Sequence, residues 1–381
     1  MSYKPGREMA PSQTRRVLFF RPQLGDGGAD RVTITLLRHL DRSRFEPVIA
    51  LVKRTGELLG EVPDDVEVVD LGASRLALAA PALARTISRL APDVVICTAG
   101  GANVIAVAAH RLARSRARLV LSERNAVKRD VGAIRTVVER GIKRVAYRMA
   151  DEITAVSDGV AEDLISDLRL PRERVRVVYN PVIHPGQREL AAAAVEHPWF
   201  TSGTPPLIAV GRLVEQKDYP TMFDAFRRIL EGAPSSRLAI FGKGPLRAAL
   251  EQRVGALGLA DRIQFFGFDP NPFRYMARAS VMLQSSRAEG LPGTIIQSMG
   301  CGTPVVSTDC DHGPREVIDD GANGYLVPVG DANRLADRAL ELLADPGLRA
   351  RFSAAAASAA QRFTIENSMR RYEAALTGVE A

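Results

Sequence analysis

The sequence predicts two doubly wound α/β domains, each a parallel sheet covered by helices on both faces, with a cleft between them. Short apolar runs alternate with helical patterns almost from end to end, which is typical of parallel sheets with crossover helices. This alternation breaks at Asn180-Pro181 and restarts near residue 207. At 381 residues the chain also suits two domains better than one, because a single core stops growing near roughly 250–300 residues.

The elements can be placed in order from this pattern. Helices such as 28–40, 81–90 and 219–231 separate the apolar runs, which have the length and composition of buried strands. The strands expected in the first half are 15–20, 46–52, 66–71, 93–98, 118–122, 152–157 and 175–180. Those expected in the second half are 207–213, 237–242, 262–267, 280–286, 303–308 and 324–329.

The same pattern sets the boundaries of the domains. The residues before the first strand are polar and contain no apolar segment of the kind that signal peptides need. The parts expected are a disordered lead-in (1–14), an N-terminal Rossmann-like domain (15–185), a linker (186–205), a C-terminal Rossmann-like domain (206–363), and a terminal helix (364–381) that packs back onto the first domain.

Composition narrows the class of protein. No stretch approaches the ~20 consecutive apolar residues that a membrane span needs. The three cysteines are few and odd in number, which suits a reducing cytosol. The five histidines form no H-x-x-x-H pair and no cluster with cysteine. We therefore expect a cytoplasmic protein without a metal site.

The net charge of +7 is concentrated in residues 111–148, which alone carry +9. Such a patch attracts polyanions, for example an anionic membrane surface, although a solvated basic face that binds nothing is the alternative. Inside it, residues 131–149 show helical spacing of apolar side chains. We expect this stripe to pack under the sheet and the basic residues to stay outside. The apolar residues are Val131, Ile134, Val137, Val138, Ile142 and Val145, and the basic ones are Arg135, Arg140, Lys143, Arg144 and Arg148.

The first strand leads into a glycine-rich loop that opens a helix. Gly27 and Gly28 let the backbone approach a ligand, and the helix N-terminus offers free N–H groups to an anion. A plain tight turn is the alternative. The loop is no dinucleotide fingerprint, because G-x-G-x-x-G fails at Asp30. The later Gly242-Lys243-Gly244-Pro245 likewise lacks the spacing of a P-loop.

Two cations follow the first strand of the second half. Arg212 and Lys217 project from one strand-to-helix loop, where they can pair with a diphosphate and stabilise the charge that builds on it as a leaving group. A pair of surface charges is the alternative.

Further on, an acid precedes a loop and a short helix, in the order Glu289, Gly290, Leu291, Pro292, Gly293, with Gln297 inside the helix. Such an acid accepts hydrogen bonds from sugar hydroxyls, beside the N–H groups of a helix N-terminus.

Several motifs together resemble glycosyltransferase family 4, from about residue 16 to the terminal helix. They are GGADRV (27–32), VSDGVAEDL (156–164), VYNPV (178–182), VGRLVEQKD (210–218), FGKGP (241–245), the E-G-L-P to G-x-P-V-V-S block (289–307) and GPREVI (313–318). The resemblance implies the GT-B fold, in which two Rossmann-like domains face each other. It also implies transfer of a sugar from a nucleotide diphosphate, commonly UDP, with retention of anomeric configuration and without a required metal or other cofactor.

The resemblance also implies roles for particular residues. Arg212 and Lys217 would hold the donor diphosphate, and Glu289 would contact the hydroxyls of the donor sugar. The N-terminal domain would be the acceptor side, with the Gly27–Gly28 loop facing the phosphates. The catalytic candidates are therefore Glu289, Arg212, Lys217 and Glu123. The donor-binding candidates are Gly27, Gly28, Arg212, Lys217, Gly244, Phe268, Glu289, Gly290, Leu291, Pro292, Gly293 and Gln297.

Two positions depart from the family pattern. Gln297 stands where the second acid of the E-x7-E motif would meet the donor ribose, so an acceptor remains but a charge is lost. The strand end where many members carry a histidine reads Ser122-Glu123-Arg124-Asn125. Glu123 is therefore only a candidate, and a structural acid paired with nearby arginines is the alternative.

Asp309 and Asp311 form a D-x-D pair, which in the other large glycosyltransferase fold binds a divalent ion. Here it lies within a block that the family-4 motifs already explain, so we expect no metal there.

These observations predict a glycosyltransferase that acts on a lipid-linked or oligosaccharide acceptor, as in polysaccharide biosynthesis. A nucleotide-sugar 2-epimerase, which shares the fold, is the alternative enzyme. A basic polyanion-binding protein is a third possibility, but nucleic acid is not expected as a partner, because 111–148 contains Tyr147 as its single aromatic residue. The basic patch makes the cytoplasmic face of a membrane the expected location.

Overall fold

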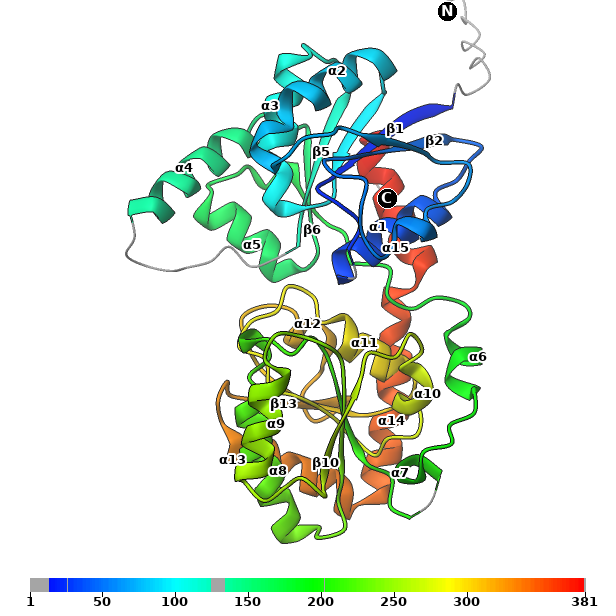
Figure 1. Ribbon diagram of the computed structural model, residues 1–381, viewed down its shortest axis with the longest axis vertical. Coiled ribbons are helices and arrows are strands. Elements are labelled where there is room, and N and C mark those ends of the chain that lie inside the picture. Colours follow the sequence, from blue (N-terminus) through cyan, green and yellow to red (C-terminus); the bar gives the residue numbers. More distant parts are fainter. Residues whose placement is uncertain (1–13, 26, 125–133, 202, 380–381) are drawn as a thin grey trace, which may run out of the picture.

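The protein consists of two α/β domains stacked along its long axis (Figure 1). The structure, a computed structural model, describes residues 14–25, 27–124, 134–201 and 203–379. Residues 1–13 of the expected lead-in and the last two of the terminal segment lie outside this range. Each domain is built on one parallel sheet, of seven strands in the first and six in the second. The predicted fold class is confirmed.

The first sheet has the order β3-β2-β1-β4-β5-β6-β7. The chain starts in the middle of the sheet, runs to one edge, returns to the centre and then runs to the other edge. The strands are β1 (Arg15–Arg21), β2 (Phe45–Leu51), β3 (Glu67–Asp70), β4 (Val94–Cys97), β5 (Arg118–Glu123), β6 (Glu152–Ala155) and β7 (Val175–Val177). The helices are α1 (Gly28–His39), α2 (Ala80–Leu90), α3 (Asn103–Leu112), α4 (Ile134–Tyr147) and α5 (Asp158–Asp167).

The second sheet repeats this winding, with the order β10-β9-β8-β11-β12-β13. Its strands are β8 (Leu207–Val210), β9 (Leu238–Phe241), β10 (Ile263–Gly267), β11 (Met282–Gln284), β12 (Val305–Thr308) and β13 (Gly324–Val327). Its helices are α8 (Tyr219–Gly232), α9 (Arg247–Ala256), α10 (Phe273–Met276), α11 (Gly293–Gly300), α12 (Pro314–Val317), α13 (Ala332–Ala344) and α14 (Pro346–Ala360). All thirteen predicted strands overlap strands of the structure.

Both faces of each sheet are covered, so the central strands are apolar throughout. In β1, Leu18 and Phe20 enter the core on one face, while Val17 and Phe19 enter the core on the other. The second of these cores also contains Tyr372 and Leu376 of the terminal helix α15 (Ile365–Thr377). The last helix of the chain therefore packs on the first domain.

The chain crosses between the domains twice, and the two crossings lie side by side. The backbone N–H groups of Val182 and Ile183 both donate to the carbonyl of Phe363, and the N–H of Ile365 donates to the carbonyl of Ile183. Since the two crossings are bonded to each other, they form one short double-stranded hinge.

The segment expected as a linker, 186–205, is largely folded onto the second domain. It contains α6 (Gln187–Ala192) and α7 (Pro198–Thr201), and Phe200 is buried against Phe241 and Tyr275. The aromatic side chains in HPWF explain this difference, because they give the segment enough apolar surface to pack.

The expectation for the apolar stripe of α4 is wrong for Val138, Ile142 and Val145. Val131 and the side chains of Ile134 and Val137 lie outside the described part of the chain. Val138, Ile142 and Val145 are 54%, 52% and 56% exposed. Tyr147, on a different face of α4, and Ala146, which borders the exposed stripe, enter the core. No helix of the described part of the chain is long and apolar enough to cross a membrane.

Candidate active site

The winding of the second sheet creates a site between β8 and β11. These strands are neighbours, and the chain leaves them toward opposite edges of the sheet. In open parallel sheets, ligands bind beyond the carboxyl ends of the strands at such a switch point. Arg212 follows β8 and Glu289 follows β11, so the fold brings the two predicted segments to the same edge.

Lys217 and Glu289 form an ion pair at this edge. The Lys217 Nζ lies 2.5 Å from the Glu289 Oε1, and the Gln284 side-chain amide donates to the same oxygen at 3.3 Å. The two charged side chains are only 17% and 10% exposed. The sequence assigned these residues to different parts of a donor, and the structure shows that they form one charged unit.

The loop that carries Lys217 is held firmly against the segment after β11. The Ser285 hydroxyl donates to the carbonyls of Lys217 and Asp218, at 2.8 and 2.9 Å. The Gln216 side-chain amide donates to the carbonyl of Ala288 at 2.6 Å. Asp218 itself has a φ of 46° and is buried, with Arg287 donating to its carboxylate. Because these bonds are already formed, the cation is oriented before any ligand arrives.

Arg212 is the open cation of the site. Its side chain is exposed, and no ion pair joins it to any residue in the described ranges. Gln297 is half-buried on α11, and its backbone carbonyl accepts a bond from Gln187. The site thus offers one cation with no acidic partner and one that is already paired with an acid.

The Gly290 loop reaches the first domain. A Cβ atom at Gly290 would lie 2.2 Å from the carbonyl oxygen of Arg124, so only glycine fits this contact. Leu291, Pro292 and Gly293 then lead into α11, with Pro292 as its N-cap residue. Gly244 has a packing role, because a Cβ there would lie 2.4 Å from the carbonyl oxygen of Leu213.

Phe268 lies just beyond β10, with its ring about half exposed. Lys243 Nζ lies 5.4 Å from the ring centroid, and the guanidinium of Arg31, from α1 of the first domain, lies 5.8 Å from it. Gly27 is the N-cap residue of α1, so the helix that follows the glycine loop contacts Phe268 across the domain boundary. Lys243 also reaches across to Glu57, at 3.1 Å.

Glu123 is buried at the end of β5 and has its bonds satisfied. Its carboxylate accepts from the Tyr147 hydroxyl at 2.7 Å and lies 2.5 Å from the Lys143 Nζ, both on α4. Burial, with this carboxylate beside it, raises the pKa of Tyr147 well above its usual value. The charged partner is a lysine, where the sequence suggested arginines. In this arrangement the carboxylate holds α4 against the strand end.

Several residues that join the domains were missed by sequence reasoning. The Glu316 carboxylate accepts from the N–H groups of Asp158 and Gly159, at 2.7 and 2.8 Å, and so caps the N-terminus of α5. His312 lies 2.8 Å from Asp163 in the same helix. Burial raises the pKa of Glu316. GPREVI contains Glu316, but nothing in the motif names its partner.

Two further features near the site have no free reactive group. Asp309 of the D-x-D pair accepts two bonds from Arg315, and the described residues hold no group of three or more possible metal ligands. Burial and the charge of Glu289 raise the pKa of Cys310 to about 12, so its thiol stays protonated.

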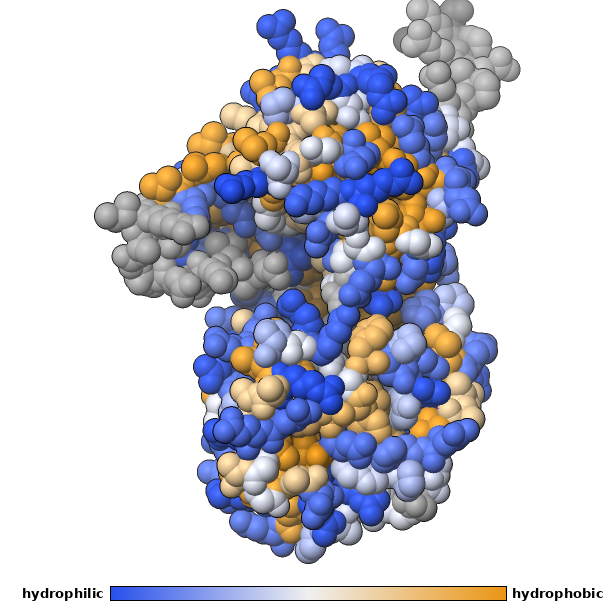
Figure 2. All heavy atoms as spheres, in the orientation of Figure 1, coloured by the Kyte–Doolittle hydropathy of each residue, from blue (hydrophilic) through white to orange (hydrophobic). Residues whose placement is uncertain are grey.

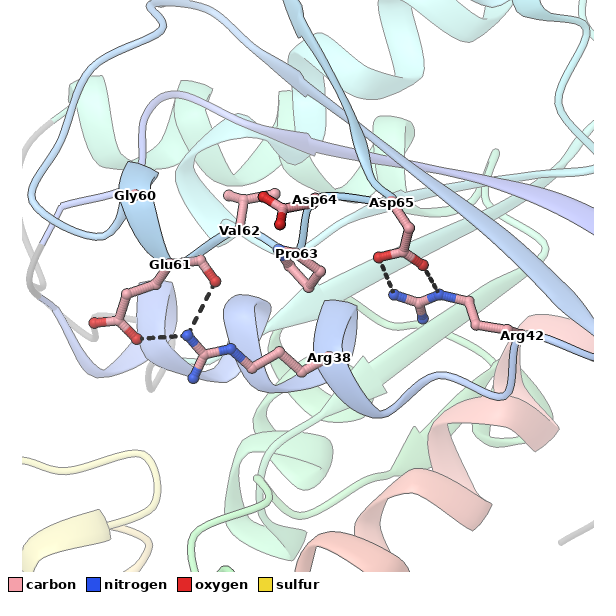
Figure 3. A pocket seen from close by; sticks show the side chains of 8 residues that line it. All are labelled: Arg38, Arg42, Gly60, Glu61, Val62, Pro63, Asp64 and Asp65. Carbon is pink, nitrogen blue, oxygen red and sulfur yellow. Dashed lines mark hydrogen bonds and ion pairs between the residues drawn. The ribbon is translucent and has the colours of Figure 1, made fainter.

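A hollow of about 540 Å³ lies away from the site, on the first domain (Figure 3). Its cations, Arg38 and Arg42, point at Glu61 and Asp65 and are paired with them.

Comparison with known families decides the classification. The model for Glycosyltransferase Family 4 matches residues 26–184, and the model for Glycosyl transferases group 1 matches residues 199–359. Together they span most of both domains. The chain belongs to glycosyltransferase family 4.

Individual relatives agree with this family. The chain is 28% identical over 354 residues to an N-acetylgalactosamine-N,N'-diacetylbacillosaminyl-diphospho-undecaprenol 4-alpha-N-acetylgalactosaminyltransferase of Campylobacter jejuni, covering 89% of this chain and 93% of the relative. It is 33% identical over 207 residues to the lipopolysaccharide core biosynthesis glycosyltransferase LpsE of Rhizobium meliloti, covering 54% of this chain and 58% of the relative.

Solved structures share the GT-B fold. The Anabaena protein HepE, crystallised with UDP, superposes with a TM-score of 0.78 at 21% identity, covering 96% of this chain and all of the other. The apo lipopolysaccharide outer core galactosyltransferase WaaB superposes with a TM-score of 0.71 at 18% identity, covering 95% of this chain and 99% of the other.

Proposed function

We propose that this family 4 glycosyltransferase transfers a hexosyl or N-acetylhexosaminyl group from a UDP-sugar, with retention, to a hydroxyl of a lipid-linked glycan or other cell-surface polysaccharide precursor. The observation that carries the proposal is the placement of Arg212 and the Lys217–Glu289 pair in the loops that follow the neighbouring strands β8 and β11, at the switch point of the second sheet. UDP as the carrier is supported by the complex of HepE with UDP-glucose. The acceptor class is supported by the names of the relatives from Campylobacter jejuni and Rhizobium meliloti.

The chemistry follows from the charges of the site. The bond between the anomeric carbon and the diphosphate oxygen breaks, and its electron pair leaves with UDP. The acceptor oxygen forms the new bond on the same face of the sugar, and its proton passes to the departing phosphate. Arg212 and Lys217 stabilise the negative charge that grows on that phosphate, and the backbone that carries Lys217 is already held in place by Ser285.

The Lys217–Glu289 pair has a second consequence for donor binding. When a diphosphate approaches Lys217, the lysine gains a new anionic partner, and the Glu289 oxygens become available to the hydroxyls of the donor sugar. One exchange of partners thus links binding of the diphosphate to binding of the sugar.

The reaction is expected to proceed without a divalent metal. Two protein cations serve the leaving group, and Asp309 is already paired with Arg315. Turnover in excess EDTA should therefore equal turnover without chelator. Purified enzyme, passed over a chelating resin and assayed with and without added Mg²⁺ or Mn²⁺, provides the measurement. A strict need for either ion would contradict metal independence and return attention to Asp309 and Asp311.

A lipid-linked acceptor places the enzyme at the cytoplasmic face of a membrane. The excess of positive charge in 111–148 supports this placement, because basic residues near a bilayer are attracted to anionic headgroups.

Incubation with a panel of UDP-sugars tests the proposed function. We expect UDP release from a subset of donors, strongly increased by a membrane extract that supplies lipid-linked acceptors, with the labelled sugar recovered in the lipid fraction. The Arg212→Ala variant is the control for contaminating hydrolases. Conversion of the donor to its 2-epimer without any acceptor would instead assign the epimerase activity.

A further inference from the structure

Helix α4 presents a buried inner side and an exposed apolar stripe. Its inner face carries Ala146 and Tyr147, which are buried in the core of the first domain. An outer face carries Val138, Ile142 and Val145, which follow the i, i+4, i+7 spacing of one helical stripe. Met149, just past the helix end, continues this stripe and is also exposed. Two different apolar faces therefore exist on this helix, and the fold uses one of them.

The inner face is fixed by polar bonds as well as by packing. The Tyr147 hydroxyl lies between the Glu123 carboxylate and the Asn103 amide, at 2.7 Å from each. Lys143 adds its ion pair to Glu123. Rotating the helix to bury the outer stripe would break these bonds and leave Glu123 buried without its partners, which is costly. The outer stripe is thus held in solvent by the structure.

Positive charge borders the stripe. On the helical wheel Arg148 lies beside the exposed stripe, and Arg144 lies one step further round, between Arg148 and Tyr147. Desolvation, with the nearby positive charges of Arg148 and Arg169, lowers the pKa of Arg144. Arg148 donates to the backbone carbonyl of Arg169, so that bond leaves its charge without compensation.

The shape and composition of this surface favour a lipid partner. α4 stands at the outer rim of the first domain, and apolar atoms follow the α3–α4 edge in the space-filling view (Figures 1 and 2). Three of these four exposed side chains are aliphatic and none is aromatic, whereas the cores of protein interfaces are enriched in aromatic residues. A narrow aliphatic stripe with a basic border is the pattern of a helix that lies in the headgroup region of an anionic bilayer.

We propose that α4 docks on an anionic membrane with the Val138, Ile142, Val145 and Met149 stripe inserted among the headgroups and with Arg144 and Arg148 on the lipid phosphates. This deepens the proposed function and rests on its lipid-linked acceptor. It also changes the expected mode of binding from purely electrostatic attachment to shallow insertion. Because Glu123 clamps α4 to the end of β5, docking would also fix the orientation of the cleft toward the acceptor.

Co-sedimentation of the full-length protein with vesicles tests the docking. Vesicles of equal parts phosphatidylcholine and phosphatidylglycerol should bind the wild type at low salt, and vesicles of phosphatidylcholine alone should bind it weakly. High salt should weaken binding without abolishing it, because screening acts on the charges and not on the stripe.

Matched variants separate the contribution of the apolar stripe to vesicle binding from that of the basic residues. Ile142→Ser/Val145→Ser should reduce vesicle binding about tenfold at both salt concentrations, and Arg144→Glu/Arg148→Glu should reduce it most at low salt. Val329→Ser is the control, because Val329 is an exposed aliphatic residue of the second domain. All the substituted side chains are exposed or half-buried, so folding, checked by circular dichroism, should survive.

A tryptophan probe measures how deeply the α4 stripe inserts into the bilayer. Val145→Trp should be quenched by phosphatidylcholine brominated near the headgroup, and Val329→Trp should not. Absence of binding to anionic vesicles, or unchanged binding by the stripe variant, would overturn the proposal. A stripe variant that loses self-association in light scattering but keeps vesicle binding would identify the surface as a contact between copies and would also overturn it. None of these measurements needs donor or acceptor, so their failure leaves the transferase assignment untouched.

Discussion

Arg212→Ala and Lys217→Ala should each lower kcat by roughly 10²–10³, the scale for removing one preorganised group that stabilises transition-state charge. The charge on the departing UDP is spread over its phosphate oxygens, and these two side chains are the cations that the fold places at the switch point after β8. The effect should fall mainly on kcat, because the charge develops as the sugar–phosphate bond breaks.

The Arg212→Ala and Lys217→Ala variants should differ in thermal stability. Removal of Arg212 leaves no buried charge behind, because its side chain is exposed. Removal of Lys217 leaves the Glu289 carboxylate, which is 10% exposed, without its ion pair, so this variant should also lose thermal stability.

Initial rates at saturating UDP-sugar, together with melting curves, make this comparison. Arg227→Ala is the control, because Arg227 is exposed on α8 of the same domain. Rates close to wild type in both site variants, with folding intact, would remove the diphosphate assignment.

Glu289→Gln should lower kcat by roughly 10², whereas Gln297→Glu should change it by about tenfold or less. The first substitution removes the carboxylate that both pairs with Lys217 and accepts from the Gln284 amide. The second adds a charge at a half-buried position on α11, where the family pattern carries an acid. Each substitution changes only one terminal atom, so packing is nearly preserved.

A double variant tests whether Lys217 and Glu289 act as one unit. Groups in direct contact show non-additive effects, so Lys217→Ala/Glu289→Gln should be barely slower than the worse single variant. Steady-state kinetics of the four proteins completes the cycle. Additive losses would mean that the pair is not functionally coupled. A larger effect of Gln297→Glu than of Glu289→Gln would show that the E-x7-E motif has been assigned to the wrong positions.

Much of the fold could be predicted from the sequence because it depends on local pattern. Strands buried on both faces are read as short apolar runs, and every predicted run overlaps a strand. Arg212, Lys217 and Glu289 were found in the same way, since each lies just after a strand, where parallel sheets place their ligands.

Pairing between distant segments could not be predicted. Lys217 and Glu289 are 72 residues apart, and Glu316 caps a helix 158 residues before it. The sequence around a charged residue does not identify its ion-pair partner, because residues of opposite charge are abundant and any of them could form the pair. The linker shows the same limit, since the sequence does not say which surface Phe200 packs against.

Helix α4 shows most clearly which properties follow from the local sequence and which from tertiary contacts. Its sequence determined that an amphipathic helix with one apolar stripe and many basic residues would form there. Only the tertiary structure decided which face is buried, because Tyr147 and Lys143 bind Glu123 at the end of β5, and Tyr147 also binds Asn103 at the start of α3. These bonds hold the helix in one rotation. Val138, Ile142 and Val145 are left outside, since a helix whose polar bonds are buried cannot turn to hide a second apolar stripe without breaking them.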